Sequence, residues 1–265
     1  MTRPSSYGYD QLVAALNEVD VGAGDVVFSH VGLGMLGVCR EGRTEDAAAQ
    51  VLSRAFLDVL GPHGTWVVPT YSYSYCEGVV YDPETTIATI GPFPEFFRKL
   101  PGARRSLDPI FSVAVVGPRS GELVDDLPHD CFGRDSVYDR LRRLGATLCN
   151  VGVGFRYATF VHHVEQLVGV PYRFPKLFTG ETKAGDKLST ETWLYNVRDL
   201  GDPAALADLG RLERAAVDRG LVRTARVGRG ELTTIGFREL WDVCSENIAR
   251  DPWFLARGEA RSALR

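Results

Sequence analysis

Residues 146–165 read ATLCNVGVGFRYATFVHHVE, and their character changes twice along the stretch. The first eight residues are largely apolar and include β-branched side chains, which is typical of a buried strand. Glycines at 152 and 154 then permit a tight turn, and the residues that follow predict a helix. A strand that passes through a glycine turn into a helix indicates a layered α/β fold.

The helix expected at the end of this stretch brings a histidine and a glutamate onto one face. His162 and Glu165 are three residues apart, so the carboxylate can orient the imidazole, as a general base requires. With Thr159 as the N-cap, His162 lies at the third helical position. Ligands of open α/β sheets bind at the carboxyl ends of strands, where this pair lies. The alternative is a surface pair near a helix start, where the helix dipole favours a glutamate in any case.

Short apolar runs elsewhere alternate with amphipathic stretches, which again favours a layered α/β protein. Strands are predicted over 26–28, 66–68, 111–116 and 147–153, and helices over 45–60, 137–144, 203–219 and 237–248. Ser136 and Asp139 resemble a capping box for the second of these helices, and Gly145 closes it. No repeat or flexible linker divides the chain, so we expect one domain over residues 1–265.

The composition excludes several classes of partner. The 265 residues are 45% apolar and 24% charged, with a net charge of −4, which gives no electrostatic reason to expect nucleic acid or an anionic membrane. No run of about 18 apolar residues is present, and the N-terminus lacks the apolar core of a signal peptide. We therefore expect a cytoplasmic protein that acts on a small molecule.

The five cysteines are odd in number and widely scattered, without the paired spacing of metal ligands. They are typical of reduced thiols in a reducing compartment, and no metal is expected. One alternative uses them in catalysis: a cysteine hydrolase could pair Cys149 or Cys131 with His162. A non-catalytic binding module is a third possibility.

Five stretches, taken in order, carry a family resemblance. They are VFSHVGLGMLG at 27–37, GPHGTWVVPT at 61–70, YDP at 81–83 with GPFPEFFR at 91–98, PGARRSLDPIFS at 101–112, and the GVG-turn-helix motif at 152–165. Together they make the chain similar to the aminoglycoside 3-N-acetyltransferase family over residues ~7 to ~255. The resemblance implies an antibiotic-acetyltransferase-like fold, a single layered α-β-α domain around a mixed central sheet.

The resemblance also implies an activity, the acetyl-CoA-dependent acetylation of a primary amine on an amino sugar, and it implies roles for individual residues. His162 would be the general base, with His163 in a supporting position. The implied catalytic residues are His162, Glu165 and Asp82. Those implied for coenzyme A are Ser29, His30, Val31, Gly32, Leu36, Gly37, Thr70, Arg105, Ser106 and Ser112. Those implied for the acceptor are Tyr71, Asp108, Tyr157 and Arg173. A homodimer is compatible with the resemblance.

Several of these residues have plainer explanations. Asp82 precedes a proline and could form an Asx turn instead. The tyrosines at 71, 73, 75 and 157 could stack on sugar faces or simply be half-buried sheet residues. Arg105 could meet the phosphates of coenzyme A or belong to a solvated basic turn.

The chain also departs from the family pattern. Asp108 stands where the aminoglycoside enzymes usually carry a histidine, and Val31 and Gly32 stand where they carry two serines. These features look more like relatives found with sugar or natural-product biosynthesis. A non-sugar amine is therefore an alternative acceptor, and the choice between antibiotic resistance and biosynthesis is open.

Overall fold

The computed structural model describes residues 6–258, apart from the side chain of Arg156, and centres on a seven-stranded sheet. In spatial order its strands are β10 (Arg223–Val227), β11 (Gly230–Gly236), β7 (Thr147–Val151), β2 (Val26–Phe28), β4 (Thr65–Pro69), β6 (Val113–Val116) and β5 (Arg104–Arg105). The central β2 pairs in parallel with β7 and β4, and every outer pairing is antiparallel. The expected mixed central sheet is thus confirmed.

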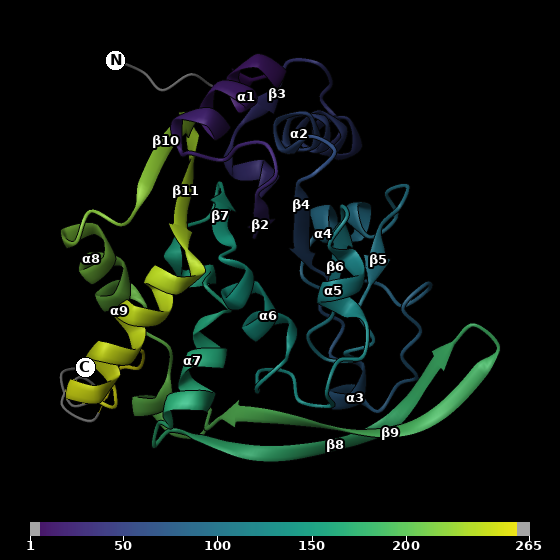
Figure 1. The fold of residues 1–265 in the computed structure, drawn as a ribbon, viewed down its shortest axis with the longest axis vertical. Coiled ribbons are helices and arrows are strands. Elements are labelled where there is room, and N and C mark those ends of the chain that lie inside the picture. The colour runs from purple at the N-terminus through teal and green to yellow at the C-terminus, as the bar shows by residue number, and fades with distance from the viewer. Residues whose placement is uncertain (1–5, 259–265) are drawn as a thin grey trace.

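Helices cover both faces of this sheet, and Figure 1 shows them on its two sides. Successive strand residues point to opposite faces, so Val27 packs in one core while Val26 and Phe28 pack in the other. The first core includes α1 (Tyr9–Glu18), α2 (Glu45–Leu60) and α4 (Pro92–Phe97). The second includes α5 (Ser120–Val124), α6 (Val137–Leu144), α7 (Val161–Val168), α8 (Gly210–Asp218) and α9 (Phe237–Arg250). This is the expected α-β-α layering.

Local capping chemistry sets two of the predicted helix boundaries. The Thr44 hydroxyl accepts a hydrogen bond from Ala47 N at 3.1 Å, so α2 begins at Glu45 as predicted. Gly145 adopts φ 67° and closes α6, also as predicted. The expected capping box is wrong, however, because the Ser136 hydroxyl makes no cap bond, and the Asp139 carboxylate accepts from Asp135 N at 2.9 Å instead.

Three other predicted elements are shorter in the structure, one because of tertiary contacts and two because of local turns. The helix expected over 203–219 is a 3₁₀ turn, η3 (Pro203–Ala205), followed by α8, because Leu206 O and Asp208 N pair with the C-terminal segment at Arg257 N and Leu255 O. The strand expected over 147–153 ends at Val151, since Gly152 turns the chain with φ +70°. The strand expected over 111–116 starts at Val113, because the Phe111 N–H bonds to Asp108 instead.

A long hairpin, not anticipated from the sequence, crosses the molecule beside α3 (Ser74–Glu77) and ends near α7 (Figure 1). Its strands are β8 (Arg173–Ala184) and β9 (Lys187–Arg198), paired along their full length. Single bridges join it to the body at Tyr81 with Thr182 and at Asp130 with Leu194. Because Arg173 and Arg198 are directly opposed, the base of the hairpin places two guanidinium groups together.

The smaller elements fill in the edges. A short parallel pair joins β1 (Ser6–Tyr7) to β3 (Val38–Cys39), and 3₁₀ turns form η1 (Leu33–Met35) and η2 (Phe155–Tyr157).

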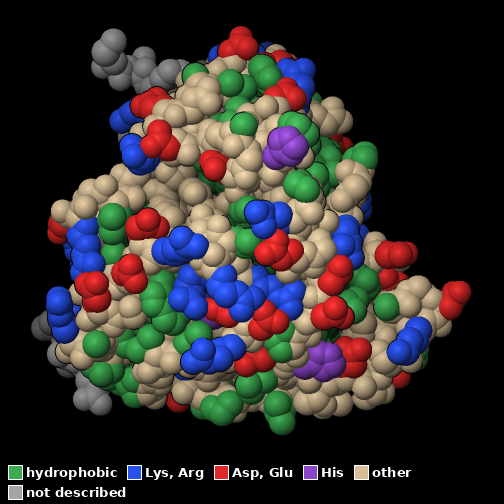
Figure 2. Space-filling model, in the orientation of Figure 1, with side chains coloured by type: hydrophobic (Ala, Val, Ile, Leu, Met, Phe, Trp, Pro, Cys, Tyr) green, Lys and Arg blue, Asp and Glu red, His purple; other side chains and the backbone are tan. Residues whose placement is uncertain are grey.

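Figure 2 shows basic side chains gathered over α6 among acidic ones. Two arginines of α6, Arg142 and Arg143, are ion-paired with Asp139 and Asp135. Between residues 6 and 258, no helix has the length and apolarity needed to cross a membrane.

Candidate active site

The glycine turn after β7 leads through η2 into α7, where the predicted base lies. The helix begins at Val161 with Phe160 as its N-cap, so His162 occupies the second helical position rather than the third. Thr159 makes no cap bond, and its hydroxyl lies 3.2 Å from Nε2 of His30. The expected N-cap is therefore wrong, and Thr159 instead connects the α7 entrance to the loop after β2.

His162 and Glu165 make the contact expected from their spacing. Nδ1 of His162 lies 3.1 Å from Oε2 of Glu165. The imidazole packs against Phe132 at 5.2 Å and Phe111 at 6.5 Å between ring centroids, yet 24% of its side chain stays exposed. Since Nδ1 faces the carboxylate, Nε2 is the nitrogen left for a substrate.

Glu165 is fully buried and held from several sides. Its carboxylate accepts hydrogen bonds from Tyr172 Oη at 2.9 Å, Arg173 Nε at 2.6 Å and Arg198 Nη2 at 2.6 Å. Burial by itself would raise the pKa of this carboxyl, but the bond from His162 and the two guanidinium charges outweigh it and lower the pKa to about 2. Glu165 is thus a fixed anion at neutral pH.

Both imidazoles near the α7 entrance are neutral at pH 7. Burial, followed by the charge of Arg173, lowers the pKa of His162 to about 4, against the opposing effect of Glu165. Burial, followed by the neighbouring His162, lowers the pKa of His30 to about 3. A neutral imidazole has a lone pair available, which is the state that a general base needs.

The loop after β2 is pinned to the His162 motif. Gly32 N donates to Val151 O at 2.9 Å, and Val31 forms a bridge with Val151. A Cβ on Gly152 would lie 2.7 Å from Gly32 O, so this close approach requires glycine. The two segments singled out in the sequence are therefore neighbours in space.

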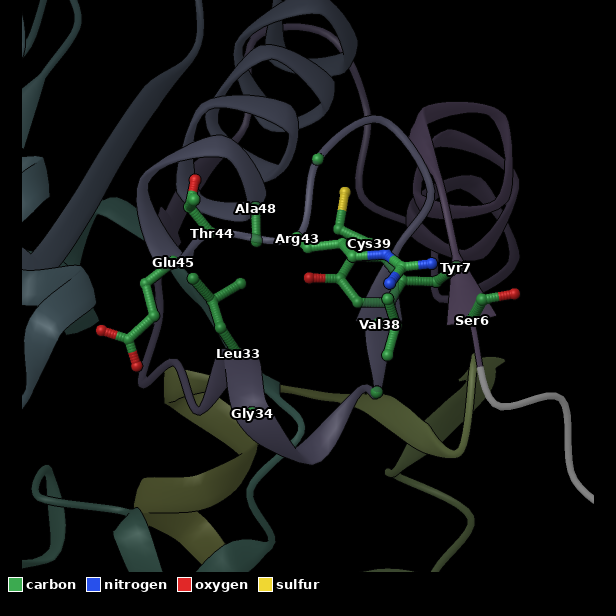
Figure 3. Close-up of a pocket in the computed structure, with 12 residues that line it drawn as sticks. Ser6, Tyr7, Leu33, Gly34, Val38, Cys39, Arg43, Thr44, Glu45 and Ala48 are labelled. Atoms are coloured by element: carbon green, nitrogen blue, oxygen red, sulfur yellow. The ribbon is translucent and has the colours of Figure 1, made fainter.

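A cavity of about 560 Å³ opens beside this loop (Figure 3). Leu33, Gly34 and Gly37 line one side, and Thr44 and Glu45 at the start of α2 line another. A smaller cavity of about 150 Å³ shares Leu33 and Gly34 and adds Val31, Gly32 and the α4 ring of Phe93. Of the residues expected to bind coenzyme A, Val31, Gly32 and Gly37 line these cavities.

Other residues expected at the cofactor are used inside the protein. The Arg105 guanidinium donates to Thr70 O at 2.6 Å, to Thr70 Oγ1 at 3.1 Å and to Ser112 Oγ at 3.2 Å, and also to Thr86 O. Ser106 Oγ accepts from Val113 N at 3.0 Å. Thr70, Ser106 and Ser112 are 0% exposed, and their hydrogen bonds tie these side chains into the end of the sheet.

Ser29 and Leu36 also point inward. The Ser29 hydroxyl accepts from Trp66 Nε1 at 3.0 Å, and both side chains are 0% exposed. Among the residues expected to bind coenzyme A, these two and the group around Arg105 belong to the packed interior.

The two other acidic residues expected at the site, Asp82 and Asp108, each accept hydrogen bonds from backbone N–H groups of a turn. Asp82 accepts from Glu84 N at 2.8 Å and Thr85 N at 3.3 Å, which is the Asx turn considered as its alternative role. Asp108 is buried and accepts from Ile110 N and Phe111 N, both at 2.8 Å. Burial raises the pKa of Asp108 to about 6, with those two backbone bonds opposing it.

The residues expected to contact the acceptor divide in the same way. Tyr71 is buried, with its hydroxyl 2.6 Å from that of Tyr138. Arg173 lies behind the imidazole, where it bonds to Glu165. Tyr157 remains 45% exposed, with its ring 6.3 Å from that of His30. Of the four, Tyr157 is the only one that is not buried.

The structure gives no support to a cysteine nucleophile. Cys149 lies in the core on the α2 side of the sheet, and burial raises the pKa of its thiol to about 12. Cys131 is buried against Asp108 at 3.6 Å, and burial raises the pKa of its thiol well above the usual range. Neither thiol ionises near neutral pH. Over residues 6–258, no group of three or more His, Cys, Asp or Glu side chains is arranged to hold a metal.

Sequence reasoning missed Tyr172 and Arg198 as partners of Glu165. Arg198 lies 33 residues from Glu165, so no local spacing could connect them. Tyr172 and Arg173 follow α7 directly, but their direction depends on the hairpin, which the sequence did not reveal.

Helices thus cover both faces of the central sheet, and a carboxylate-oriented histidine lies close to the glycine-containing loop after β2. The sequence model of the aminoglycoside 3-N-acetyltransferase family matches residues 30–249. The chain belongs to this family and is an acyltransferase.

Individual relatives agree with this assignment. Aminoglycoside N(3)-acetyltransferase IV of Salmonella sp is 28% identical over 245 residues, covering 91% of this chain and 87% of the relative. Aminoglycoside N(3)-acetyltransferase VII of Streptomyces paromomycinus is 29% identical, covering 88% of each.

Solved structures share the fold. Aminoglycoside acetyltransferase AAC(3)-Xa superposes with a TM-score of 0.81 at 23% identity, covering 95% of each chain. AAC-IIIb, solved as a binary complex with CoASH, superposes with a TM-score of 0.79 at 22% identity, covering 93% of this chain and 97% of the other.

Proposed function

We propose that this protein transfers an acetyl group from acetyl-CoA to a primary amine of an amino sugar, with His162 as the general base. The observation that carries the proposal is the pair of His162 and Glu165. The carboxylate holds Nδ1 at 3.1 Å, and the partly exposed imidazole has Nε2 free for an amine. The related enzymes named for aminoglycosides support an amino-sugar acceptor, which includes a nucleotide-linked sugar or an aminoglycoside 3-amino group.

In the proposed reaction, His162 takes a proton from the acceptor and later gives it to the leaving thiolate. An ammonium group gives a proton to Nε2, and the freed nitrogen lone pair attacks the thioester carbonyl carbon. A carbon–nitrogen bond forms, the attacking nitrogen loses its second proton to solvent, and the tetrahedral intermediate collapses as the carbon–sulfur bond breaks. The proton on Nε2 then passes to the leaving thiolate, which regenerates the neutral imidazole and releases a thiol.

The cavity beside the loop after β2 is the proposed place for acetyl-CoA. Its lining by Leu33, Gly34 and Gly37 leaves backbone groups accessible, and its volume of about 560 Å³ suits an elongated ligand. The bonds from Gly32 to Val151 and from Thr159 to His30 keep this loop next to α7. The acetyl donor and the base are thus expected on adjoining segments.

A non-sugar amine is the second candidate acceptor, and the aromatic rings near the base are compatible with it. Phe132 and Phe111 contact the imidazole, and Tyr195 packs on Phe111 at 4.8 Å between centroids. Such rings suit either a sugar face or an apolar amine.

The test is a direct assay with purified protein. Acetyl-CoA and a panel of amino sugars, aminoglycosides and apolar amines are incubated with the enzyme, and thiol release and product mass are followed. We expect His162→Ala to lower the rate about 100-fold or more, because general-base catalysis commonly contributes that much. His63→Gln, at an exposed turn, is the matched control and should keep full activity. Full acetyl transfer by the His162→Ala variant would overturn the assigned mechanism.

A further inference from the structure

The base of the β8–β9 hairpin forms a rigid clamp around Glu165. The side chains of Arg173 and Arg198 are 1% and 7% exposed. Nε of Arg173 bonds to Oε2 and Nη2 of Arg198 bonds to Oε1, each at 2.6 Å. Their other ends are anchored on Asn196 O at 2.7 Å and Ala205 O at 2.6 Å. The carboxylate is therefore fixed from β8, which begins eight residues after it, and from β9, where Arg198 lies 33 residues away.

The same clamp also reaches the imidazole. Nη2 of Arg173 lies 2.5 Å from Nδ1 of His162, the nitrogen that also faces Glu165 at 3.1 Å. A guanidinium group only donates, and a carboxylate only accepts. Nδ1 can satisfy one of them at a time: it carries a proton for Glu165 or presents a lone pair to Arg173.

The two contacts correspond to two tautomers with different consequences. With the proton on Nδ1, the Nε2 lone pair is free to take a proton from the amine. With the proton on Nε2, the Nδ1 lone pair accepts from Arg173 and the ring cannot act as a base. The imidazolium form carries protons on both nitrogens, so it cannot accept a hydrogen bond from Arg173 and is repelled by the positive charge of that guanidinium.

We propose that Arg173 and Arg198 are positioning residues: Arg198 fixes Glu165, and Arg173 competes with Glu165 for Nδ1 of His162 and so sets its tautomer and speeds its release of a proton. This inference rests on the proposed role of His162 and adds the residues that control it. A weakly held proton suits the second half of the reaction, in which the imidazolium must protonate a leaving thiolate.

The charges around the imidazole agree with this assignment. The ionisable groups facing it or Glu165 come from several segments: Glu165 from α7, Tyr172 and Arg173 at the start of β8, Tyr195 and Arg198 from β9, His30 from the loop after β2, and Cys244 from α9. Two of these groups are cationic and one is anionic. An imidazolium would add a third positive charge, which the clamp disfavours.

The test reads the imidazole itself by NMR and needs neither acceptor nor acetyl-CoA. Side-chain ¹H–¹⁵N spectra of labelled full-length protein are recorded from about pH 8 to pH 4, which spans histidine titration. The signal missing in His162→Gln identifies His162 among the five histidines. The variants are Arg173→Met, Arg173→Lys and Arg198→Met. Arg119→Met is the control, since Arg119 forms an exposed ion pair with Glu122.

We expect Arg173→Met to raise the titration midpoint of His162 by about one pH unit or more and to shift its tautomer toward Nδ1–H. Arg198→Met should raise the midpoint with little change of tautomer, and Arg119→Met should change neither. If Arg173→Met fails to fold, Arg173→Lys decides. It keeps the charge, but its single nitrogen replaces the three guanidinium nitrogens that separately reach Glu165, Asn196 and His162, so the tautomer should still shift.

An unchanged tautomer ratio in a folded Arg173 variant would overturn the proposal. Absence of acetyl transfer by the unmodified protein is a separate result, which removes the proposed function and leaves the NMR outcome readable. With an acceptor in hand, Arg173→Met should also move the acidic limb of the pH profile of kcat/KM upward, while the KM for acetyl-CoA stays unchanged.

Discussion

At the scale of single residues, Glu165 is the side chain on which the site depends most. It is fully buried and interacts with two guanidinium groups, one phenol and one imidazole. Removing one member of a buried ion pair leaves the opposite charge buried without a partner. The resulting loss in the free energy of unfolding is much larger than the net stabilisation that the intact pair provides.

Glu165→Gln should therefore destabilise the protein by about 3–5 kcal/mol, because Arg173 and Arg198 would remain buried without a counter-charge. Urea denaturation monitored by circular dichroism measures the loss. Glu122→Gln is the control: its side chain is 51% exposed and pairs with Arg119, so a change within about 0.5 kcal/mol is expected. Equal losses in the two variants would contradict the burial argument.

His162 should also contribute to acid lability. Its pKa is lowered in the folded protein to about 4, so the unfolded chain binds a proton first as the pH falls below the ordinary histidine value of about 6.5. Stability is thus complete above about pH 6.5 and declines as the pH drops toward 4.

We expect His162→Gln to reduce this decline by up to about 1.4 kcal/mol per pH unit, the contribution of one proton. Urea titrations at several pH values provide the measurement. His63→Gln serves as the exposed control, and an identical slope in both variants would show that His162 does not drive the acid response.

At the scale of elements, the turn between β7 and α7 joins the two halves of the site. Its geometry requires glycine at position 152 but leaves room for a side chain at position 154. Gly152 has φ +70° and meets Gly32 O, while Gly154 has φ −85° and open space around it.

Gly152→Ala should cost about 1–3 kcal/mol and weaken acetyl-CoA binding, because strain and a clash would push the loop after β2 away from α7. Thermal unfolding and calorimetric titration with acetyl-CoA measure both effects. Gly154→Ala, two residues on, is expected to leave both unchanged. Comparable behaviour of the two variants would refute the requirement for glycine at 152.

The helix N-termini offer a second comparison at this scale. Thr44→Ala should destabilise the protein by about 1 kcal/mol, since the hydroxyl caps α2. Ser136→Ala should change stability by less than about 0.5 kcal/mol, because the Ser136 hydroxyl is buried without a hydrogen-bond partner. Chemical denaturation of both variants tests whether cap geometry, rather than residue type, determines the cost.

At the scale of the whole molecule, one sheet connects two cores. Alternate residues of β2 and β4 point into opposite cores, so neither core can lose its packing without exposing the other. We therefore expect residues 1–265 to unfold as a single domain, as the lack of linkers in the sequence also predicts.

Equilibrium unfolding by urea should show coincident transitions by circular dichroism and tryptophan fluorescence. Trp66 reports on the α2 side, where it stacks on Phe56 at 4.1 Å, and Trp193 reports on the hairpin. Trp193→Phe removes the hairpin reporter and leaves Trp66, Trp241 and Trp253 in the body, and its midpoint should match that of circular dichroism. A separate earlier transition would indicate that the hairpin unfolds independently.

The sequence by itself determined the features that depend on neighbours along the chain. The order of strand, glycine turn and helix over 146–165 followed from residue type, as did the helix over 45–60 and the Gly145 stop. The contact between His162 and Glu165 followed from helical spacing. Family motifs added the fold and the class of reaction.

Tertiary structure decided the rest, because it depends on residues that meet only after folding. The hairpin brings Arg198 to Glu165, and the pairing with residues 255–257 breaks the helix expected over 203–219. Arg105 and Arg173, both expected at ligands, turn inward because buried carbonyls and a buried carboxylate need their donors. The histidine of residues 146–165 was visible in the sequence, whereas the clamp that controls it arises from strands that the sequence did not reveal.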